Sequence, residues 1–262
     1  MNSIATLHQL RLHLGFAAED TAEDARLQDM LESASALITR TTHREFMPRR
    51  ATIPHEVHLY DPTELILSED VLELTALYNG TGDSIDIDSD VVVIASSVLH
   101  LINGSFVYED TPLNAIQVQG IWGWHDDWSN AWVNSADTVQ DNPLSDSATT
   151  LTVTDADGTN SIAHSPRFQV GQLLKIAEEY LRVLAIDTAT NTLTVQRGVN
   201  GTTAAEHTTS TIIYIYHPPL DAMNLCLRLA TWLYREPDGY VGDELPRVIW
   251  RMLNRLRRLK VA

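Results

Sequence analysis

The chain has 262 residues, of which 44% are hydrophobic, so it can bury the core of one large domain or two small ones and is not globally disordered. Its formal net charge of −17 opposes non-specific binding to nucleic acid. The single cysteine, Cys226, excludes an intrachain disulfide. Neither a signal peptide nor an apolar stretch of membrane-spanning length is recognisable, so we expect a soluble protein made in a cytoplasm.

The charge is unevenly distributed along the chain. Residues 1–50 carry a net charge of −1 and residues 51–240 carry −20, whereas residues 241–262 carry +4. A large acidic body therefore ends in a short basic segment, which needs an explanation of its own.

Two helices are predicted at the start of the chain. Ser3 can cap a short helix that ends before Gly15, because serine is a favoured N-cap and glycine a favoured terminator. A second helix is predicted from near Thr21, where a weakened capping box precedes apolar residues at helical spacing. Pro48 ends this helix at or before Met47.

Residues 52–124 change to a pattern of short β-type runs. These runs are EVHLY, LELTALY, VVVIA and AIQVQGIWGW, and turn-forming dipeptides such as Asn79-Gly80 separate them. We expect a small, mainly antiparallel β unit here.

A second β unit is predicted at residues 149–216, after a polar loop or linker at residues 125–148. Its segment QLLKIAEEYLRVLAID is compatible with a helix or with strands. The preceding Gly171 and the β-rich neighbouring segments favour strands.

Two more helices are predicted at the end of the chain. Pro218-Pro219 opens the first, whose polar residues form one thin stripe, so we expect it to be buried on several sides. The last helix is predicted from near Asp243. One of its faces is apolar and holds Leu245, Val248, Ile249, Met252, Leu256 and Leu259. Another face carries a stripe of arginines, Arg247, Arg251, Arg255 and Arg258.

Together these elements predict an α+β fold. Its helical part is built from the N- and C-terminal helices, with a small antiparallel β unit and a second, inserted β domain. The predicted domains are residues 1–134 with 217–262, and residues 137–216 as the insertion.

A metal site is not predicted. Asp86, Asp88 and Asp90 begin like a calcium-binding loop, but Val91 occupies the glycine position and Ser97 the position of the closing glutamate. Alternation along a strand places the three carboxylates on one face, which is more simply a solvated face.

The triplet His125-Asp126-Asp127 is the most enzyme-like feature. No nucleophile motif, P-loop or dinucleotide-binding motif accompanies it. Trp124, Trp128 and Trp132 lie nearby and could build a sugar-binding platform or anchor an interface. We favour a subunit interface, and we predict no catalytic residue and no cofactor.

The opening stretch LHQLRLHLGFAAEDTAEDARLQDMLESASALITRTTHREF resembles the N-terminus of tailed-phage head–tail connector proteins, also called adaptors or head-completion proteins. Thr42, Arg44 and Phe46 match the family's T-x-R-x-F-like ending. The run Ala115–Trp124 resembles the strand that closes the family's β unit, and Pro218–Glu236 resembles its proline-started helix. The insertion of about eighty residues departs from the family pattern and itself resembles a β module of phage neck and tail proteins.

The resemblance implies a non-enzymatic virion protein of the neck, made in the host cytoplasm. Such proteins form a ring, usually a dodecamer, that binds under the portal and extends the DNA channel toward a stopper or tail protein. An acidic body suits a channel through which DNA passes without binding, and no membrane contact is implied. Another neck, tail or baseplate protein is the alternative, and a glycan-binding or glycan-cleaving protein is the competitor from a different class.

The family's C-terminal segment often contacts the portal, which offers a role for the basic end. We predict a docking arm in which one tryptophan packs into a partner groove and arginines pair with acidic residues. The residues predicted for portal docking are Arg247, Trp250, Arg251, Arg255 and Arg258. Two alternatives stay open: the helix could pack only on its own subunit with solvated arginines, or the arginines could touch DNA.

Overall fold

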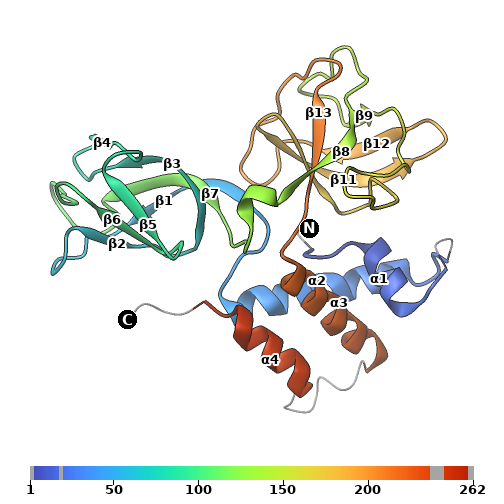
Figure 1. Cartoon of the computed structure of the whole chain (residues 1–262), viewed down its shortest axis with the longest axis horizontal. Coiled ribbons are helices and arrows are strands. Elements are labelled where there is room, and N and C mark those ends of the chain that lie inside the picture. Colours follow the sequence, from blue (N-terminus) through green and yellow to red (C-terminus); the bar gives the residue numbers. More distant parts are fainter. Residues whose placement is uncertain (1–2, 18–19, 237–244, 259–262) are drawn as a thin grey trace. The chain divides into compact units, whose positions relative to one another are not determined.

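The computed structural model describes residues 3–17, 20–236 and 245–258, and the chain folds into two compact units (Figure 1). Unit 1 comprises Met1–His43 and Asp126–Arg257, and unit 2 comprises Arg44–His125 and Arg258–Ala262. The predicted domain limits at residues 134 and 217 divide the chain differently from these two units, because they separate residues 137–216 from the rest of the chain. These limits stay a prediction.

The expected α+β fold class is wrong, because the protein is mostly β. The described residues form four α-helices and thirteen strands in three antiparallel sheets, with 29% of residues in strands and 23% in helices. The prediction gave too much weight to the periodic helices at the chain ends. It also assigned residues 125–148 to a loop, whereas a 3₁₀ turn at Trp128–Asn130 and strand β8, Trp132–Thr138, lie there.

Four helices form the helical part of unit 1: α1 (Leu7–Leu14), α2 (Asp24–Thr42), α3 (Leu220–Arg235) and α4 (Arg247–Leu256). Helix α1 ends at Gly15 as predicted, but its N-cap is Thr6 and not Ser3. The Thr6 side chain accepts a hydrogen bond from the Gln9 amide, and the Gln9 side chain accepts one from the Thr6 amide. This reciprocal capping box satisfies two amides at the helix start.

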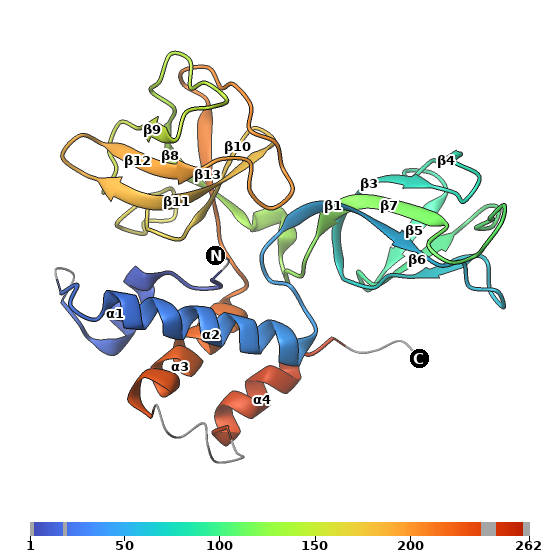
Figure 2. The ribbon, with the colours of Figure 1, turned by 180° about the vertical axis from the view of Figure 1, so that it is seen from behind.

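Helix α3 packs along the long helix α2 and also contacts α1 and α4 (Figure 2). It starts directly after Pro219, as predicted, and its buried side chains explain its apolar composition. Cys226 lies fully buried in it, 3.4 Å from the Ser35 hydroxyl of α2, and burial raises the pKa of its thiol to about 11. The thiol is therefore a core side chain.

Helix α4 ends earlier than the sequence predicted, because it stops at Leu256 and does not include Arg258. It begins at Arg247, immediately after Pro246, while the predicted start at Asp243 lies outside the described residues. Its buried side chains are Ile249, Leu253 and Leu256, and they face α2 and α3.

None of the helices in the described part of the chain has the length and apolar character that crossing a bilayer requires.

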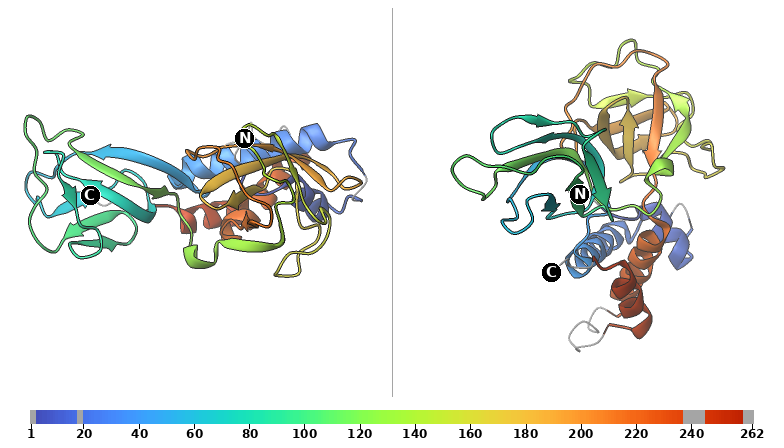
Figure 3. Two further views of the ribbon diagram at one scale, coloured as in Figure 1. Left: turned by 90° about the horizontal axis from the view of Figure 1, so that it is seen from above. Right: turned by 60° about the vertical axis from the view of Figure 1, so that its left-hand side comes forward.

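A six-stranded antiparallel sheet forms the β domain of unit 1, and Figure 3 shows its strongly curled backbone. The sheet encloses an apolar core of its own. Its strand order is β8-β13-β10-β11-β12-β9. The segment QLLKIAEEYLRVLAID, which was compatible with a helix or with strands, forms the β10–β11 hairpin. The preference for strands is therefore confirmed. The remaining bounds are β9 (Thr150–Thr152), β10 (Leu173–Ile176), β11 (Glu179–Asp187), β12 (Thr192–Gln196) and β13 (Ile212–Tyr216).

Unit 2 contains the other two sheets, ordered β1-β7-β3-β4 and β2-β6-β5, around one apolar core. All their strand pairings are antiparallel, as predicted for this segment. The predicted strand EVHLY is wrong, because residues 56–60 form a loop after β1. The bounds are β1 (Arg49–His55), β2 (Glu64–Ile66), β3 (Val71–Tyr78), β4 (Ser84–Ile85), β5 (Val91–Ile94), β6 (Val98–Leu101) and β7 (Ile116–Trp122).

Candidate functional site

Helix α4 presents a basic and partly apolar face to solvent. Its successive positions are 100° apart, so Arg247 and Arg251 lie opposite the buried Ile249 and Leu253. Trp250 borders the arginines and is 48% exposed, and Val248 is 55% exposed on their other flank. A tryptophan beside arginines has the composition of a protein-binding hot spot.

The arginines of α4 differ in their partners. Arg255 reaches the Asp221 carboxylate of α3 at 3.5 Å, and both side chains are largely exposed. Arg247 and Arg251 make no ion pair or hydrogen bond with the described residues.

Arg258 does not belong to this face, although the sequence placed it in the same stripe. Helix α4 ends at Leu256, and Arg258 belongs to unit 2. Its guanidinium donates to the carbonyls of Leu67 and Ser68 and lies 3.5 Å from the buried Asp70 carboxylate. Arg258, one of the five residues predicted for portal docking, thus has partners in its own subunit. The docking role of Arg247, Trp250, Arg251 and Arg255 stays a prediction.

The three tryptophans predicted to form a subunit interface do not form one cluster. Trp124 belongs to unit 2, where it packs edge-on against Phe46 and under the Arg44 guanidinium, 4.4 Å from the ring centroid. Trp128 and Trp132 belong to unit 1 and contact each other. An interface role for each of them stays a prediction.

Trp132 also packs inside the β domain. Its ring lies 5.0 Å from the Tyr180 ring and 5.2 Å from the Tyr216 ring, and the Lys175 ammonium approaches its face. The platform that a sugar ring would need is thus covered on the Trp132 side by the protein's own aromatic side chains.

The enzyme-like triplet is divided between the units, since His125 ends one segment and Asp126 begins the next. Asp127 accepts hydrogen bonds from the Ser129 hydroxyl and the Asn130 amide, which fixes the 3₁₀ turn before β8. That is a structural role for this carboxylate.

A metal-binding cluster is not found in the described part of the chain, where no three histidine, cysteine or acidic side chains come together suitably. Asp86 instead accepts a hydrogen bond from the Asp88 amide, as turn-forming aspartates do. Hydrogen bonds with residues 88 and 89 lower the pKa of the Asp86 carboxyl.

A charged cluster around Glu179 in unit 1 is buried and internally satisfied. The Glu179 carboxylate accepts hydrogen bonds from Arg197, from His207 and from the amides of Gly198 and Ala205. Burial would raise the pKa of Glu179, but these donors outweigh it and lower the pKa. With its acceptor sites occupied, the carboxylate is a structural clamp for the loop between β12 and β13.

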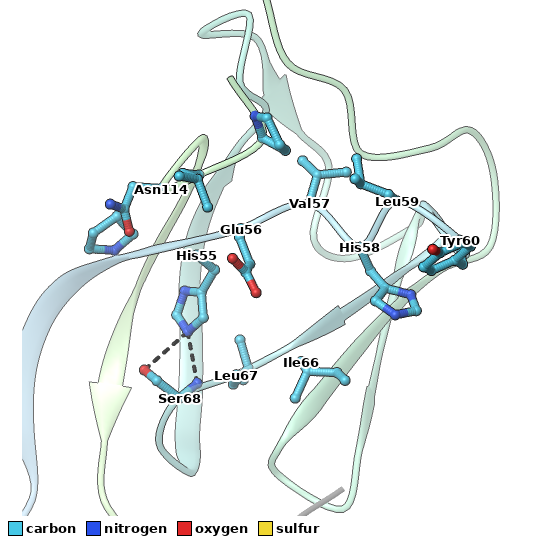
Figure 4. Close-up of a pocket in the computed structure, with 13 residues that line it drawn as sticks. His55, Glu56, Val57, His58, Leu59, Tyr60, Ile66, Leu67, Ser68 and Asn114 are labelled. Carbon is cyan, nitrogen blue, oxygen red and sulfur yellow. Dashed lines mark hydrogen bonds between the residues drawn. The ribbon is translucent and has the colours of Figure 1, made fainter. Parts of the chain in front are cut away.

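A pocket of about 640 Å³ opens in unit 2 beside the loop after β1 (Figure 4). Val57 and Leu67 are buried in its wall. Around them the lining includes exposed apolar side chains: Leu59, Tyr60, Ile66 and Leu113. Tyr60 is 96% exposed and belongs to this group of exposed apolar side chains around one pocket, and such a group is typical of an interaction site.

His55 lines the pocket but has a structural role. Its Nε2 accepts a hydrogen bond from the Ser68 amide at 3.0 Å, and its Nδ1 lies 3.0 Å from the Ile53 carbonyl. The ring stacks on Trp122, and burial lowers the pKa of the imidazole. A neutral ring that donates from Nδ1 to Ile53 satisfies both contacts.

Glu56 is a charged group of the pocket that has no partner among the residues the structure describes. Figure 4 shows its carboxylate directed across the pocket toward Leu67. Among the described residues none donates a hydrogen bond or forms an ion pair with it. The pocket thus combines apolar walls with one available carboxylate, which suits a ligand that is apolar and positively charged.

The pocket was not predicted from the sequence, because the segment EVHLY, which forms part of its lining, has the composition of a strand. In a half-buried strand, alternate residues face the core, which would have explained the apolar Val57 and Leu59 together. In the structure Val57 is buried, whereas the consecutive Leu59 and Tyr60 are both exposed. The Asp61-Pro62 turn directly after them was the available signal for a loop.

No protein-family model matches the chain, and no curated protein matches it. Among solved structures, the chain is similar to one described as the neck of an empty GTA particle computed with C6 symmetry. The alignment covers 98% of this chain and 90% of that chain, with 15% sequence identity and a TM-score of 0.35. At this identity and TM-score the likeness carries no argument about fold or function.

Proposed function

We propose that the chain is a structural protein of a phage-type virion neck. On this proposal its copies form a connector ring that binds under the portal and extends the DNA channel toward a stopper or tail protein. The order of the connector-like segments in the sequence supports it, and so does the acidic body, which repels the DNA that passes through. The protein is then a scaffold and not an enzyme.

The observation that carries the proposal is the exposed face of α4. A monomeric protein gains nothing by holding Trp250 half in water beside Arg247 and Arg251, which have no carboxylate partner among the described residues. Such a face is explained by another protein that covers the tryptophan and pairs with the guanidinium groups. We therefore assign α4 as the docking element that holds the subunit in the neck.

The test is co-sedimentation with portal-bearing, DNA-filled, tailless heads. We expect the full chain to bind at a fixed copy number per head and the Trp250→Ala and Arg251→Glu variants to bind at least tenfold more weakly, a loss of about 1.4 kcal/mol. Matched controls are Leu220→Ala and Arg228→Glu, which change exposed side chains of α3. If the full chain does not bind, the connector proposal is wrong. Binding to purified tails alone would identify another neck, tail or baseplate protein.

A further inference from the structure

We propose that the exposed face of α4 in one copy docks into the unit 2 pocket of a neighbouring copy, with Trp250 in the apolar pocket and an arginine beside Glu56. This inference rests on the proposed ring and names the partner of its α4 face. On this proposal α4 joins subunits, and the portal is bound by the assembled ring.

The surface of unit 2 is built for a partner that is both apolar and basic. The segment Arg44–His125 holds thirteen acidic residues and three arginines, a net charge of −10. It also holds ten of the eighteen exposed large hydrophobic side chains of the described chain, although it makes up less than a third of the residues. Two such surfaces would repel each other, so the occupant of the pocket must come from a basic surface.

Each copy carries such a surface on α4. Trp250 supplies a large apolar side chain, while Arg247 and Arg251 supply guanidinium groups without partners among the described residues. Glu56 supplies a carboxylate at the pocket that no described residue pairs with, and Tyr60 and Leu113 supply exposed apolar area around it. The two surfaces are therefore complementary in both charge and polarity.

The size of the pocket fits this occupant. Its volume of about 640 Å³ lies within the range of about 300–1,000 Å³ that is typical of sites enclosing a ligand. A helix that lays a bulky side chain into an apolar groove is a recurring mode of recognition. A tryptophan with the stem of one arginine is an anchor of suitable size.

The geometry of association follows from having one helix and one pocket per copy. Because the two surfaces differ, each contact is head-to-tail, and every copy offers a free helix on one side and a free pocket on the other. Head-to-tail contacts form a ring when the rotation between copies closes, so that all helices and pockets are then occupied. The inference thus supplies the contact that the proposed connector ring requires.

The first test mixes two variants of the full chain in solution. One variant, Trp250→Ala with Arg251→Glu, has a disabled helix and an intact pocket. The other, Glu56→Lys with Leu113→Glu, has a disabled pocket and an intact helix. We expect neither variant to self-associate and their mixture to form a 1:1 pair by sedimentation velocity. If the mixture contains only monomers, or if either variant alone associates as the wild type does, the inference is overturned.

The second test uses the heads described above and separates this inference from the proposed function. If ring closure precedes portal binding, the pocket variant loses head binding as strongly as the helix variant does. Full head binding by the pocket variant, with loss in the helix variant, would show that α4 binds the portal itself and would overturn the inference. If the wild type does not bind heads, the proposed function is wrong, and pairing in solution still decides the inference.

A matched control excludes a general effect of charge on the surface. Leu184→Glu changes a half-exposed leucine of β11, outside the pocket, in the same way as Leu113→Glu. We expect this control to associate and to bind heads as the wild type does. Circular dichroism melts of all variants should overlap, because each substituted side chain is exposed or half-exposed.

Discussion

The Glu179 carboxylate accepts two hydrogen bonds from the Arg197 guanidinium, at 2.7 and 2.8 Å, inside the β domain of unit 1. The two side chains are 1% and 6% exposed. Arg197 also donates to the carbonyls of Ser145, Ala148 and Ala205, so one ion pair connects two loops to strand β11. This pair ties the loop before β9 and the loop before β13 to the sheet.

Replacing Glu179 by glutamine should destabilise the protein by about 3–5 kcal/mol, because it leaves the buried Arg197 charge without its partner. The loss is measurable as a lower denaturation midpoint in urea. Arg255→Ala is the control, since it removes an exposed ion pair and should cost less than about 1 kcal/mol. Equal losses in the two variants would contradict the clamp role of Glu179.

Acidification should destabilise the β domain. Hydrogen bonds hold the pKa of both Glu179 and Asp137 below their ordinary values, against the effect of burial. Their stabilising contribution is therefore complete above the unfolded-state pKa values and is lost as the pH falls through the folded-state values. We expect the melting temperature to fall from about pH 5 downward, and the Glu179→Gln variant to show a flatter profile. An unchanged slope in that variant would refute the assignment.

The opposite sign applies to Asp70 in unit 2. Burial raises the pKa of this carboxyl although Arg44 and Arg258 lower it, so its ionisation costs stability as the pH rises above the unfolded-state pKa. The wild-type unit 2 should therefore lose stability as the pH rises through this range. The Asp70→Asn variant, which cannot ionise at this position, should lack that loss. Hydrogen exchange of the β3 and β7 amides, measured at two pH values, would report on unit 2 alone.

Trp132→Ala should destabilise the isolated subunit by about 3 kcal/mol, because it removes a ring packed against Tyr180 and Tyr216. Trp128→Ala should cost less than half of that, since the described ring contact of Trp128 is with Trp132. Thermal unfolding of the two variants provides the comparison. A stable Trp128→Ala variant with weakened self-association would support the predicted interface role of Trp128.

Gly120→Ala should destabilise unit 2 by about 1–3 kcal/mol through overpacking. A Cβ at this position in β7 would lie 2.5 Å from the Glu73 carbonyl oxygen, in the irregular register of β3 against β7. The backbone must shift to admit it. Gln119→Ala, at the neighbouring position, is the control and should melt close to the wild type.

Local sequence signals predicted two helix limits correctly, whereas the capping box predicted at Thr21 did not form and α2 begins at Asp24. Gly15 and Pro219 mark helix limits through backbone geometry that few other residues share, and these limits are found where they were expected. The apolar composition of α3 likewise predicted its burial, because a helix with only a thin polar stripe must be covered on several sides. The hairpin of β10 and β11 followed from β-rich neighbours.

Local signals failed where long-range contacts decide. Thr6 replaced Ser3 as the N-cap because the Gln9 side chain completes the capping box with Thr6. The Ile4 amide next to Ser3 instead donates a hydrogen bond to the Ser35 hydroxyl of α2. Residues 125–148 were predicted as a loop because polar residues dominate them. Strand β8 forms there because β13 offers it a ladder of hydrogen bonds.

The sequence by itself determined the charge asymmetry between an acidic body and a basic end, and it determined the amphipathic character of α4, since both depend only on the order of residues. The tertiary structure decided which arginines remain available, by placing Arg258 against Asp70 and leaving Arg247 and Arg251 without partners among the described residues. It also decided that Glu56 and Leu113 line one pocket. The physical reason is that the partners of a side chain depend on segments that only folding brings together.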